Sequence, residues 1–378
     1  MNDLSQDLMS QATRLTRVGR LTEATELIQR ALGGAAGASA VPLHRTPHAG
    51  ASVIRLSGPV PAAVLPRPPL AGAPPAATTG RDEFRSGTHT QASLTRSYRL
   101  YVPPGHEGRP LPLVVMLHGC TQDPDDFAAG TDMNQRAREQ GFVVLYPAQA
   151  RDANPSRCWN WFKHNHQQRG SGEPAVIAGM TQAVIKEHGI DPKRVYIAGL
   201  SAGGAMAAIV ADAYPEIFHA VGVHSGLPRG AASDVRGALS VMKSGVAGQR
   251  PGALAGRVRS ASATDERARR HIPTIVFHGD QDQTVHPRNG EGVIAAALAG
   301  ANAGAGPLRV EQGVSPQGRR YTRSIHHGGE GKVLAEHWLV HGAGHAWSGG
   351  HGKGSYTDAK GPDATGEMLR FFFERAPA

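Results

Sequence analysis

Short apolar segments alternate with longer segments of helical periodicity between residues 97 and 340. Most of the short segments are apolar throughout, which is typical of parallel strands that helices cover on both faces of a sheet. The predicted strands are residues 97–102, 113–117, 142–146, 194–198, 219–223, 274–277 and 335–340. The predicted helices are residues 173–188 and 202–214. This order of elements predicts an α/β fold with a mostly parallel sheet, in which residues 97–102 alternate as an edge strand does.

Two segments of different character precede this region. Residues 4–32 carry apolar side chains at helical spacing, interrupted by Gly19, so we expect residues 1–32 to form a short helical hairpin. A single helix pair has no neighbouring repeat that buries its apolar face, and we therefore expect docking or self-association rather than a peptide-binding solenoid. Residues 33–80 are rich in Pro, Ala and Gly and predict a disordered linker. The main domain is expected over residues 81–378.

The composition excludes several classes of protein. Of the 378 residues, 40% are hydrophobic and 19% are charged, which is typical of a globular chain with some unstructured sequence. No apolar run approaches the ~20 residues that a membrane-spanning helix needs. The net charge of +9, from 40 basic and 31 acidic residues, is spread along the chain, and no basic cluster predicts nucleic-acid binding. The first residues lack the basic and apolar regions of a secretory signal, which favours a cytoplasmic location or another export route.

Histidine and cysteine offer few candidate metal sites. The chain has 19 histidines but only two cysteines, too few for a Cys-based zinc module or a disulfide scaffold. The histidines nearest to a metal-ligand pattern are His164, His166, His326 and His327, but no carboxylate stands at a suitable spacing beside them. We interpret them as solvated loop residues, and we predict neither a metal ion nor another cofactor.

Ser201 stands at the centre of the sequence Gly-Leu-Ser-Ala-Gly, residues 199–203, which matches the nucleophile motif G-x-S-x-G. The predicted strand 194–198 precedes this motif, and the predicted helix 202–214 follows it. Glycines at both ends permit a sharp turn from strand to helix that presents the serine hydroxyl at the edge of the sheet. The sequence therefore predicts Ser201 as a catalytic nucleophile.

A serine nucleophile needs a base that takes its proton and an acid that orients the base. Asp280 and Asp282 both follow the predicted strand 274–277. We favour Asp282 as the acid because the turn directs it inward, and we expect Asp280 to brace the loop. His341 ends the last predicted strand, whereas His345 lies beyond two glycines on a flexible loop. We therefore predict His345 as the base and His341 as a structural residue.

The tetrahedral intermediate of such a reaction needs two backbone N–H donors for its oxyanion. The N–H of Ala202 is one candidate, because it follows the nucleophile at the N-terminus of a helix. The other candidate is the N–H of Cys120, in the sequence His-Gly-Cys-Thr-Gln that follows the predicted strand 113–117. An ordinary turn at the end of this strand is the alternative interpretation.

Cys120 and Cys158 are the two cysteines of the chain, and both belong to loops that we place at one end of the sheet. Loops gathered there can bring two cysteines within the distance that a disulfide requires. A disulfide at this position holds the N–H of Cys120 still, and an oxyanion donor acts well only when it is preorganised. The alternative is a pair of buried free thiols in a reducing cytosol. We favour the disulfide.

Five motifs in a fixed order give the chain a family resemblance. They are His-Gly-Cys-Thr-Gln at 118–122, Cys-Trp-Asn-Trp-Phe at 158–162, Gly-Leu-Ser-Ala-Gly-Gly at 199–204, His-Gly-Asp-Gln-Asp at 278–282 and Gly-His-Ala-Trp at 344–347. With these motifs the chain resembles the polyhydroxybutyrate depolymerase family of esterases, which is related to the feruloyl and acetylxylan esterases. The resemblance implies an α/β-hydrolase fold and a serine carboxylic-ester hydrolase that uses Ser201, Asp282 and His345.

The substrate is implied less specifically. A polyester or oligoester of 3-hydroxybutyrate is favoured, and a feruloyl or acetylxylan ester is the alternative. A partner-docking scaffold is the alternative outside enzymes, but a scaffold has no need of a complete set of catalytic residues. Trp159, Trp161 and Trp347 either form a flat apolar surface for the substrate or pack the loops. Members of this family are usually secreted, so the resemblance implies an extracellular location, whereas the first residues, which lack a secretory signal, favour a cytoplasmic one.

Overall fold

The structure is a computed structural model, and it describes residues 53–55, 82–91, 93–105, 108–246, 271–301 and 306–375. The predicted hairpin over residues 1–32 lies outside the described residues. Of the predicted linker, residues 33–80, the structure describes Val53–Arg55, which forms strand β1 and pairs in parallel with β9. A strand at the edge of a sheet offers unpaired backbone groups, and β1 pairs with those of β9. The linker over residues 33–80 stays a prediction.

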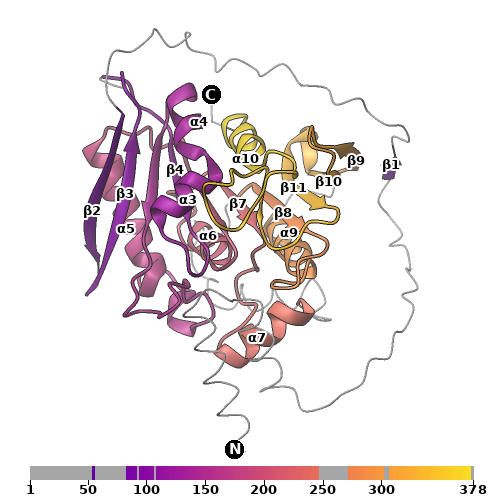
Figure 1. Ribbon diagram of the computed structural model, residues 1–378, viewed down its shortest axis with the longest axis horizontal. Helices are drawn as coiled ribbons and strands as arrows, with labels where there is room; N and C mark the ends of the chain where they lie inside the picture. The colour runs from indigo at the N-terminus through magenta and orange to yellow at the C-terminus, as the bar shows by residue number, and fades with distance from the viewer. Residues whose placement is uncertain are drawn as a thin grey trace, which may run out of the picture. The chain divides into compact units, whose positions relative to one another are not determined.

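A large mixed sheet runs through the described part of the chain (Figure 1). Its strand order is β1-β9-β10-β11-β8-β7-β6-β4-β5-β3-β2. Strands β5, β4, β6, β7, β8 and β11 are mutually parallel, and the pairs at either side of them, β2/β3 and β9/β10, are antiparallel. The bounds not yet given are β2 (Glu83–Gln91), β3 (Leu94–Val102), β4 (Leu113–Leu117), β5 (Val143–Pro147), β6 (Val195–Leu200), β7 (Ala220–His224), β8 (Thr274–Gly279), β9 (Leu308–Val314), β10 (Arg320–His327) and β11 (Val333–Val340).

The predicted α/β class is confirmed, with a correction at one edge of the sheet. Residues 97–102 belong to β3, which is not an edge strand, because β2 pairs with it along its whole length. Strand β2 has the sequence EFRSGTHTQ, in which Phe84 is the one large apolar residue. Polar residues suit an edge strand, which faces water on more sides than a central strand does. The same polarity hides β2 from a search for apolar segments.

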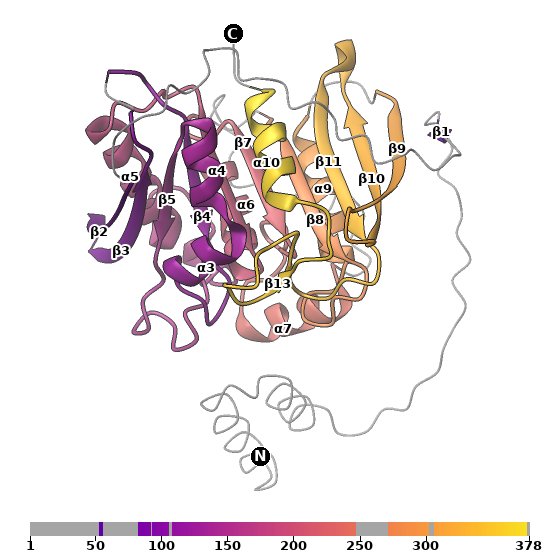
Figure 2. The same ribbon diagram turned by 45° about the horizontal axis from the view of Figure 1, so that its top comes forward.

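Helices cover both faces of the sheet (Figures 1 and 2). One apolar core lies between the sheet and α5, α6, α7 and α9, and a second lies between the sheet and α3, α4 and α10. Because both faces are covered, strands β4 to β8 are buried along their whole length. The helices are α3 (Pro124–Thr131), α4 (Met133–Gln140), α5 (Gly172–Glu187), α6 (Ala202–Ala213), α7 (Val235–Ser244), α9 (Arg288–Gly300) and α10 (Ala364–Phe373).

The parallel strands bring the predicted site residues to one edge of the sheet. The register pairs Leu117, at the end of β4, with Gly199 on β6. It also pairs Val340, at the end of β11, with Gly279 at the end of β8. The segments that follow these four strands contain every predicted catalytic and oxyanion residue, with Ala202 as the first residue of α6. They leave the sheet at its carboxyl edge, where α/β proteins place their active sites.

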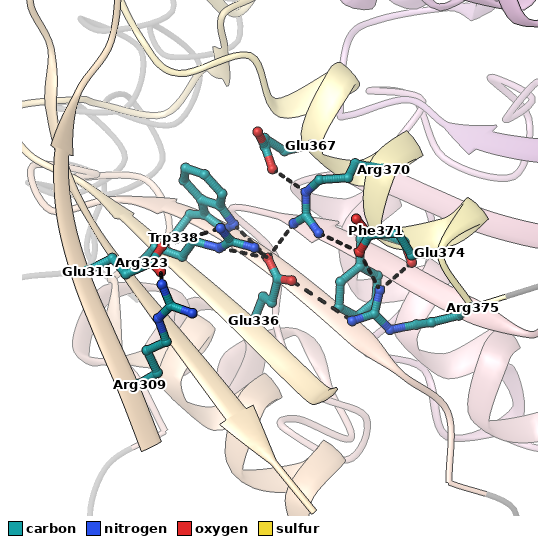
Figure 3. A network of polar contacts seen from close by, with 10 residues as sticks. All are labelled: Arg309, Glu311, Arg323, Glu336, Trp338, Glu367, Arg370, Phe371, Glu374 and Arg375. Carbon is teal, nitrogen blue, oxygen red and sulfur yellow. Dashed lines mark hydrogen bonds and ion pairs between the residues drawn. The ribbon is translucent and has the colours of Figure 1, made fainter. Parts of the chain in front are cut away.

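Glu336, on β11, ties the C-terminal helix α10 to the sheet through three arginines (Figure 3). Its carboxylate lies 3.0 Å from Nη2 of Arg323, 2.7 Å from Nη2 of Arg370 and 3.9 Å from Nη2 of Arg375. The side chain is 1% exposed. Burial raises the pKa of Glu336, but the charges of Arg370 and Arg323 outweigh burial and lower it below its ordinary value. Arg375 also lies over the ring of Phe371.

Glu336→Gln is expected to lower the free energy of unfolding by about 3 kcal/mol, because removing one partner of a buried ion pair leaves the other charges uncompensated. Urea unfolding at pH 7 measures this loss. Glu187→Gln is the matched control, since Glu187 is 57% exposed and its ion pair with Arg85 lies in water. The control is expected to change stability by less than about 1 kcal/mol.

The same variant has an expected pH dependence. The native pKa of Glu336 is lowered, so the stability that it contributes is present above the ordinary pKa of a glutamate and is lost as the pH falls through the native pKa. The difference between wild type and Glu336→Gln is therefore expected to shrink at acid pH. Equal stability of the two proteins at pH 7 would contradict the assignment of Glu336 as the shared counter-ion.

Candidate active site

Ser201 occupies the sharp turn between β6 and α6. Its φ of 57° and ψ of −121° lie in a region that residues other than glycine rarely adopt. Its N–H donates a hydrogen bond of 2.9 Å to the carbonyl oxygen of His224 at the end of β7. A Cβ atom on Gly203 would collide with the carbonyl oxygen of Leu117, and one on Gly199 would collide with the backbone of Gly203. The spacing of the two glycines therefore has a steric cause.

Asp282 and His345 form a hydrogen-bonded pair. Nδ1 of His345 lies 2.7 Å from Oδ2 of Asp282, whose side chain is fully buried. Oδ1 of Asp282 accepts hydrogen bonds from the N–H groups of Thr284 and Val285 at 2.9 and 2.8 Å. Because an ionised carboxylate can only accept, Nδ1 of His345 carries the ring proton, and Nε2 is the nitrogen free to act as a base.

His278 supports the same carboxylate, although sequence analysis assigned it no role. Its Nε2 lies 2.7 Å from the carbonyl oxygen of Val285 and 3.4 Å from Oδ2 of Asp282. Burial raises the pKa of Asp282, but the hydrogen bonds from His278 and His345 outweigh burial and hold the pKa well below its ordinary value. Asp282 is therefore an anion that lies beside the ring of His345.

Asp280 and His341 form a separate pair in the neighbouring loops. Nδ1 of His341 lies 2.9 Å from Oδ2 of Asp280, and the N–H of Gly342 donates to Oδ1 at 2.7 Å. Nε2 of His341 lies 2.8 Å from the hydroxyl of Thr322 on β10. Both ring nitrogens of His341 are thus engaged, and the pair links the loop after β8 to the end of β11.

The loop after β4 lies against the nucleophile turn. A Cβ atom built on Gly119 would be 3.6 Å from the Cβ of Ser201. The N–H of Gly119 donates to Oε1 of Gln122 at 2.9 Å, and the N–H of Thr121 donates to the carbonyl oxygen of Ser156 at 2.7 Å. These bonds fix the shape of the loop and join it to the segment that follows β5.

Cys120 and Ala202 are the two predicted oxyanion donors. In the described part of the chain, neither backbone N–H donates a hydrogen bond to the protein. Ala202 is the first residue of α6, where N–H groups have no partner within the helix. Cys120 is joined to Cys158 by a disulfide across a separation of 38 residues. The structure therefore contains the predicted bond and leaves both N–H groups available to an anion.

Two buried histidines anchor the loops on either side of the nucleophile. Burial lowers the pKa of His118 to about 4; Nε2 of this ring accepts from the N–H of Gln149, and Nδ1 lies 2.8 Å from the carbonyl oxygen of Gly119. Burial lowers the pKa of His224 to about 3, and its Nε2 accepts from the N–H of Ser348. Both rings are neutral at pH 7, which these acceptor roles require.

The part of the chain that carries Ser201 and Asp282 matches a known protein family. Residues 96–306, more than half of the chain, match the family described as Esterase PHB depolymerase. The chain belongs to this esterase family. The matched residues include the motifs at the ends of β4, β6 and β8, and the resemblance that the sequence motifs indicated is confirmed.

Individual relatives in this family carry two kinds of name. The chain is 34% identical over 189 residues to poly(3-hydroxyalkanoate) depolymerase C of Paucimonas lemoignei, a match that covers 50% of this chain and 44% of that protein. It is 31% identical over 199 residues to feruloyl esterase B of Thermothelomyces thermophilus, covering 51% and 66%. The chain thus matches less than two thirds of the length of either relative.

The solved structure of acetyl xylan esterase from Aspergillus awamori shares the fold. It aligns with a TM-score of 0.60 at 19% sequence identity and covers 76% of this chain and 99% of that chain. At this level of identity the similarity concerns the fold alone. Together with the sheet order and the helices on both faces, it shows that this member of the esterase family has an α/β-hydrolase fold.

The tryptophans of the predicted substrate surface pack the loops around the site and do not form a flat exposed surface. Trp159, Trp161 and Trp347 are at most 4% exposed. The indole N–H of Trp159 donates to the carbonyl oxygen of His118, and Trp347 stacks on the ring of His224. This burial favours the alternative that the sequence left open, in which these residues pack the loops. Indole rings bury a large apolar area, and here they use it to support the loops that carry the site.

Tyr356 is a residue near the site that sequence analysis missed. Its hydroxyl lies 3.1 Å from Oγ1 of Thr121 in the loop after β4, and its ring lies edge-on to His345 at 6.5 Å between centroids. It belongs to the segment between β12 (Trp347–Ser348) and β13 (Thr357–Asp358). A tyrosine in a polar, glycine-rich segment gives no periodic signal, so its position was not predictable from the sequence.

The histidines that came nearest to a metal-ligand pattern are not all solvated loop residues. His166 is buried, and its Nδ1 lies 3.4 Å from the buried carboxylate of Glu173. His326 and His327 belong to strand β10. Among the described residues, no group of three or more His, Cys, Asp or Glu side chains is arranged to hold a metal ion. Within the same residues, no helix has the length and apolar character to cross a membrane.

Proposed function

We propose that this protein is a serine carboxylic-ester hydrolase, with Ser201 as the nucleophile, His345 as the base and Asp282 as the residue that orients the base. The observation that carries the proposal is the 2.7 Å hydrogen bond between Asp282 and His345, at the edge of the sheet where the strained turn presents Ser201. Membership of the esterase family supports the same reaction.

In the acylation half of the reaction, Nε2 of His345 takes the proton of the Ser201 hydroxyl while Oγ bonds to the ester carbonyl carbon. The carbonyl oxygen becomes an oxyanion and accepts hydrogen bonds from the N–H groups of Cys120 and Ala202. The imidazolium of His345 is stabilised by Asp282, whose pKa is well below its ordinary value. When the carbon–oxygen bond to the alcohol breaks, the imidazolium returns its proton to the leaving oxygen.

In the deacylation half, water replaces the alcohol. His345 takes one proton from the water as its oxygen bonds to the acyl carbon, and the same two N–H groups receive the oxyanion. The bond between the acyl carbon and Oγ of Ser201 then breaks, and Oγ regains its proton from the imidazolium. The products are the carboxylic acid and the free enzyme, with no net change in the protein.

We propose a short-chain polyester or oligoester of 3-hydroxybutyrate as the substrate. The family description and the similarity to poly(3-hydroxyalkanoate) depolymerase C of Paucimonas lemoignei support this choice. An acylated sugar is the second candidate, because feruloyl esterase B of Thermothelomyces thermophilus is 31% identical over 199 residues.

Parallel assays distinguish the two substrates. The full chain is incubated with amorphous poly(3-hydroxybutyrate), with methyl ferulate and with acetylated xylan, and the acids released are measured by chromatography. We expect release of 3-hydroxybutyrate or its oligomers, and little release of ferulate or acetate. Faster release of ferulate or acetate overturns the polyester assignment, and absence of hydrolysis of any ester, including p-nitrophenyl butyrate, overturns the assignment as an esterase.

Reduction of the Cys120–Cys158 disulfide is expected to lower kcat for p-nitrophenyl butyrate about 10-fold or more, because the disulfide holds one of the two oxyanion donors in place. Activity and free thiols are measured before and after treatment with dithiothreitol. Cys158→Ser is the control, since its activity should already be low and should not respond to the reductant. Full activity in protein with two titratable thiols would contradict this role of the disulfide.

A further inference from the structure

Glu173 is a fully buried carboxylate that is connected by hydrogen bonds to the segments beside the loop that carries the Cys120 donor. It stands in the first turn of α5, and its side chain has 0% exposure. Oε1 accepts hydrogen bonds of 2.6 Å from the side-chain amides of Gln149 and Asn160, and Oε2 accepts a bond of 2.7 Å from the backbone N–H of Asn160. Both oxygens therefore have donors as their nearest partners.

Gln149 carries this network to the loop after β4. Its side-chain amide donates to the carbonyl oxygen of Cys158 at 2.9 Å as well as to Glu173. Its backbone N–H donates to Nε2 of His118 at 3.1 Å, and its Oε1 accepts from Nε of Arg96 at 3.0 Å. The carboxylate of Glu173 is thus connected to the residue two positions before Cys120 and to the disulfide partner of Cys120.

The groups around Glu173 favour its charged form. Nη2 of Arg96 lies 3.8 Å from Oε1, and Nδ1 of His166 lies 3.4 Å from Oε2. Burial raises the pKa of Glu173, but His166 and the amides of Gln149 and Asn160 lower it below its ordinary value. An anion in this position accepts from every nearby donor at once, and a neutral group of the same shape cannot do so.

We propose that Glu173 is a positioning residue for one oxyanion donor, the N–H of Cys120: through Gln149 and Asn160 its carboxylate fixes the loop that carries Cys120 and the segment that carries Cys158. This inference rests on the proposed function, since it concerns the same reaction. Glu173 has no contact with the reacting atoms, and its effect passes through His118 and the disulfide. Loss of the carboxylate moves the N–H of Cys120 away from the position that the oxyanion requires.

Glu336 offers a matched control. It is also buried, 1% exposed, and its carboxylate also accepts from several donors, but it joins β11 to α10. Both carboxylates are expected to contribute to stability. Glu173 alone is connected to the oxyanion loop, so the two variants Glu173→Gln and Glu336→Gln separate a loss of stability from a loss of donor geometry.

The test compares Glu173→Gln, Glu336→Gln and wild type as full chains. In Glu173→Gln, the NH2 group of the new side chain replaces one carboxylate oxygen and faces N–H donors of Gln149 or Asn160, which in the wild type donate to that oxygen. We expect kcat for p-nitrophenyl butyrate to fall about 10- to 100-fold with KM changed less than about 3-fold, because the donors act mainly on the transition state. A trifluoromethyl ketone, which forms an oxyanion on the serine, should bind more weakly by a similar factor. Glu336→Gln should keep kcat and inhibitor affinity within about 2-fold of wild type.

The outcomes separate the two proposals. Wild-type kcat in folded Glu173→Gln overturns the positioning role, and so does an equal fall in Glu336→Gln, which would trace the loss to stability. If Glu173→Gln does not fold, Gln149→Ala is tested in its place. This variant removes the side-chain link to Cys158 and leaves the hydrogen bonds from Asn160 to the carboxylate of Glu173. Unchanged kcat and inhibitor affinity in Gln149→Ala overturn the proposal. Wild-type protein that hydrolyses no ester rejects the esterase assignment itself, and the positioning role with it.

Discussion

Ser201→Ala is expected to reduce kcat for p-nitrophenyl butyrate by about 10⁴-fold or more, because the variant has no oxygen that can form the acyl-enzyme. The fold should be unchanged. Ser201 is 7% exposed, and the substitution removes one atom from a turn that the glycines and the bond to His224 already define. Ester turnover and circular dichroism, measured on the same preparation, check both expectations.

Ser225→Ala is the matched control for the nucleophile variant. Ser225 is fully buried where β7 ends and has a positive φ of 49°, so it shares the burial and backbone strain of Ser201. The control is expected to retain activity within about 10-fold, since the hydroxyl of Ser225 lies beside Nδ1 of His224 and has no place in the reaction. Near-normal turnover in Ser201→Ala would overturn the assignment of the nucleophile.

His345→Ala is expected to lower kcat as severely as Ser201→Ala does, by about 10⁴-fold or more. The reason is geometric: His345 is bonded through Nδ1 to the buried anion of Asp282, which leaves Nε2 for the serine proton. His341→Ala is the matched comparison, because His341 has an equivalent bond to Asp280. Its other nitrogen already contacts Thr322, so this variant should keep activity within about 10-fold of wild type.

Steady-state kinetics on both histidine variants, with thermal unfolding as a check on folding, decide between the pairs. His341→Ala is expected to lower stability, since it leaves Asp280 and Thr322 without their shared partner. An active His345→Ala protein together with an inactive but folded His341→Ala protein would transfer the role of the base to His341.

Three restraints converge on the loop that contains the Cys120 donor. The disulfide joins it to Cys158, the side chain of Gln122 binds the N–H of Gly119, and the network from Glu173 reaches it through His118. An N–H group stabilises an oxyanion best when it does not need to reorient during the reaction. This concentration of restraints around one donor is the feature of the structure that the proposed chemistry explains best.

Much of the fold was predictable because it depends on local sequence. Strands β4 to β8 are buried on both faces, so their residues are mostly apolar, and the sequence alone indicated them. Strands β2, β9 and β10 lie toward the edges of the sheet and mix polar with apolar residues. Their pairing partners are set by the rest of the sheet, which a local pattern does not contain.

The sequence by itself determined the turn at Ser201. Gly199 and Gly203 stand within two positions of the serine, so the sequence shows them directly, although the carbonyl oxygen of Leu117 that demands a glycine at 203 is brought there by the sheet. The order of the five motifs likewise identified the esterase family without any knowledge of contacts. Each motif is a short run of neighbouring residues, so it can be found without knowledge of the contacts that it makes.

Only the tertiary structure decided which distant side chains meet. It paired Asp282 with His345 and Asp280 with His341, although both aspartates stand in one loop and both histidines follow one strand. It also buried the three tryptophans and connected Glu173 through Gln149 to the segment that carries Cys158. Each of these contacts joins residues that are far apart in sequence, and their distance is set by the packing of the whole sheet.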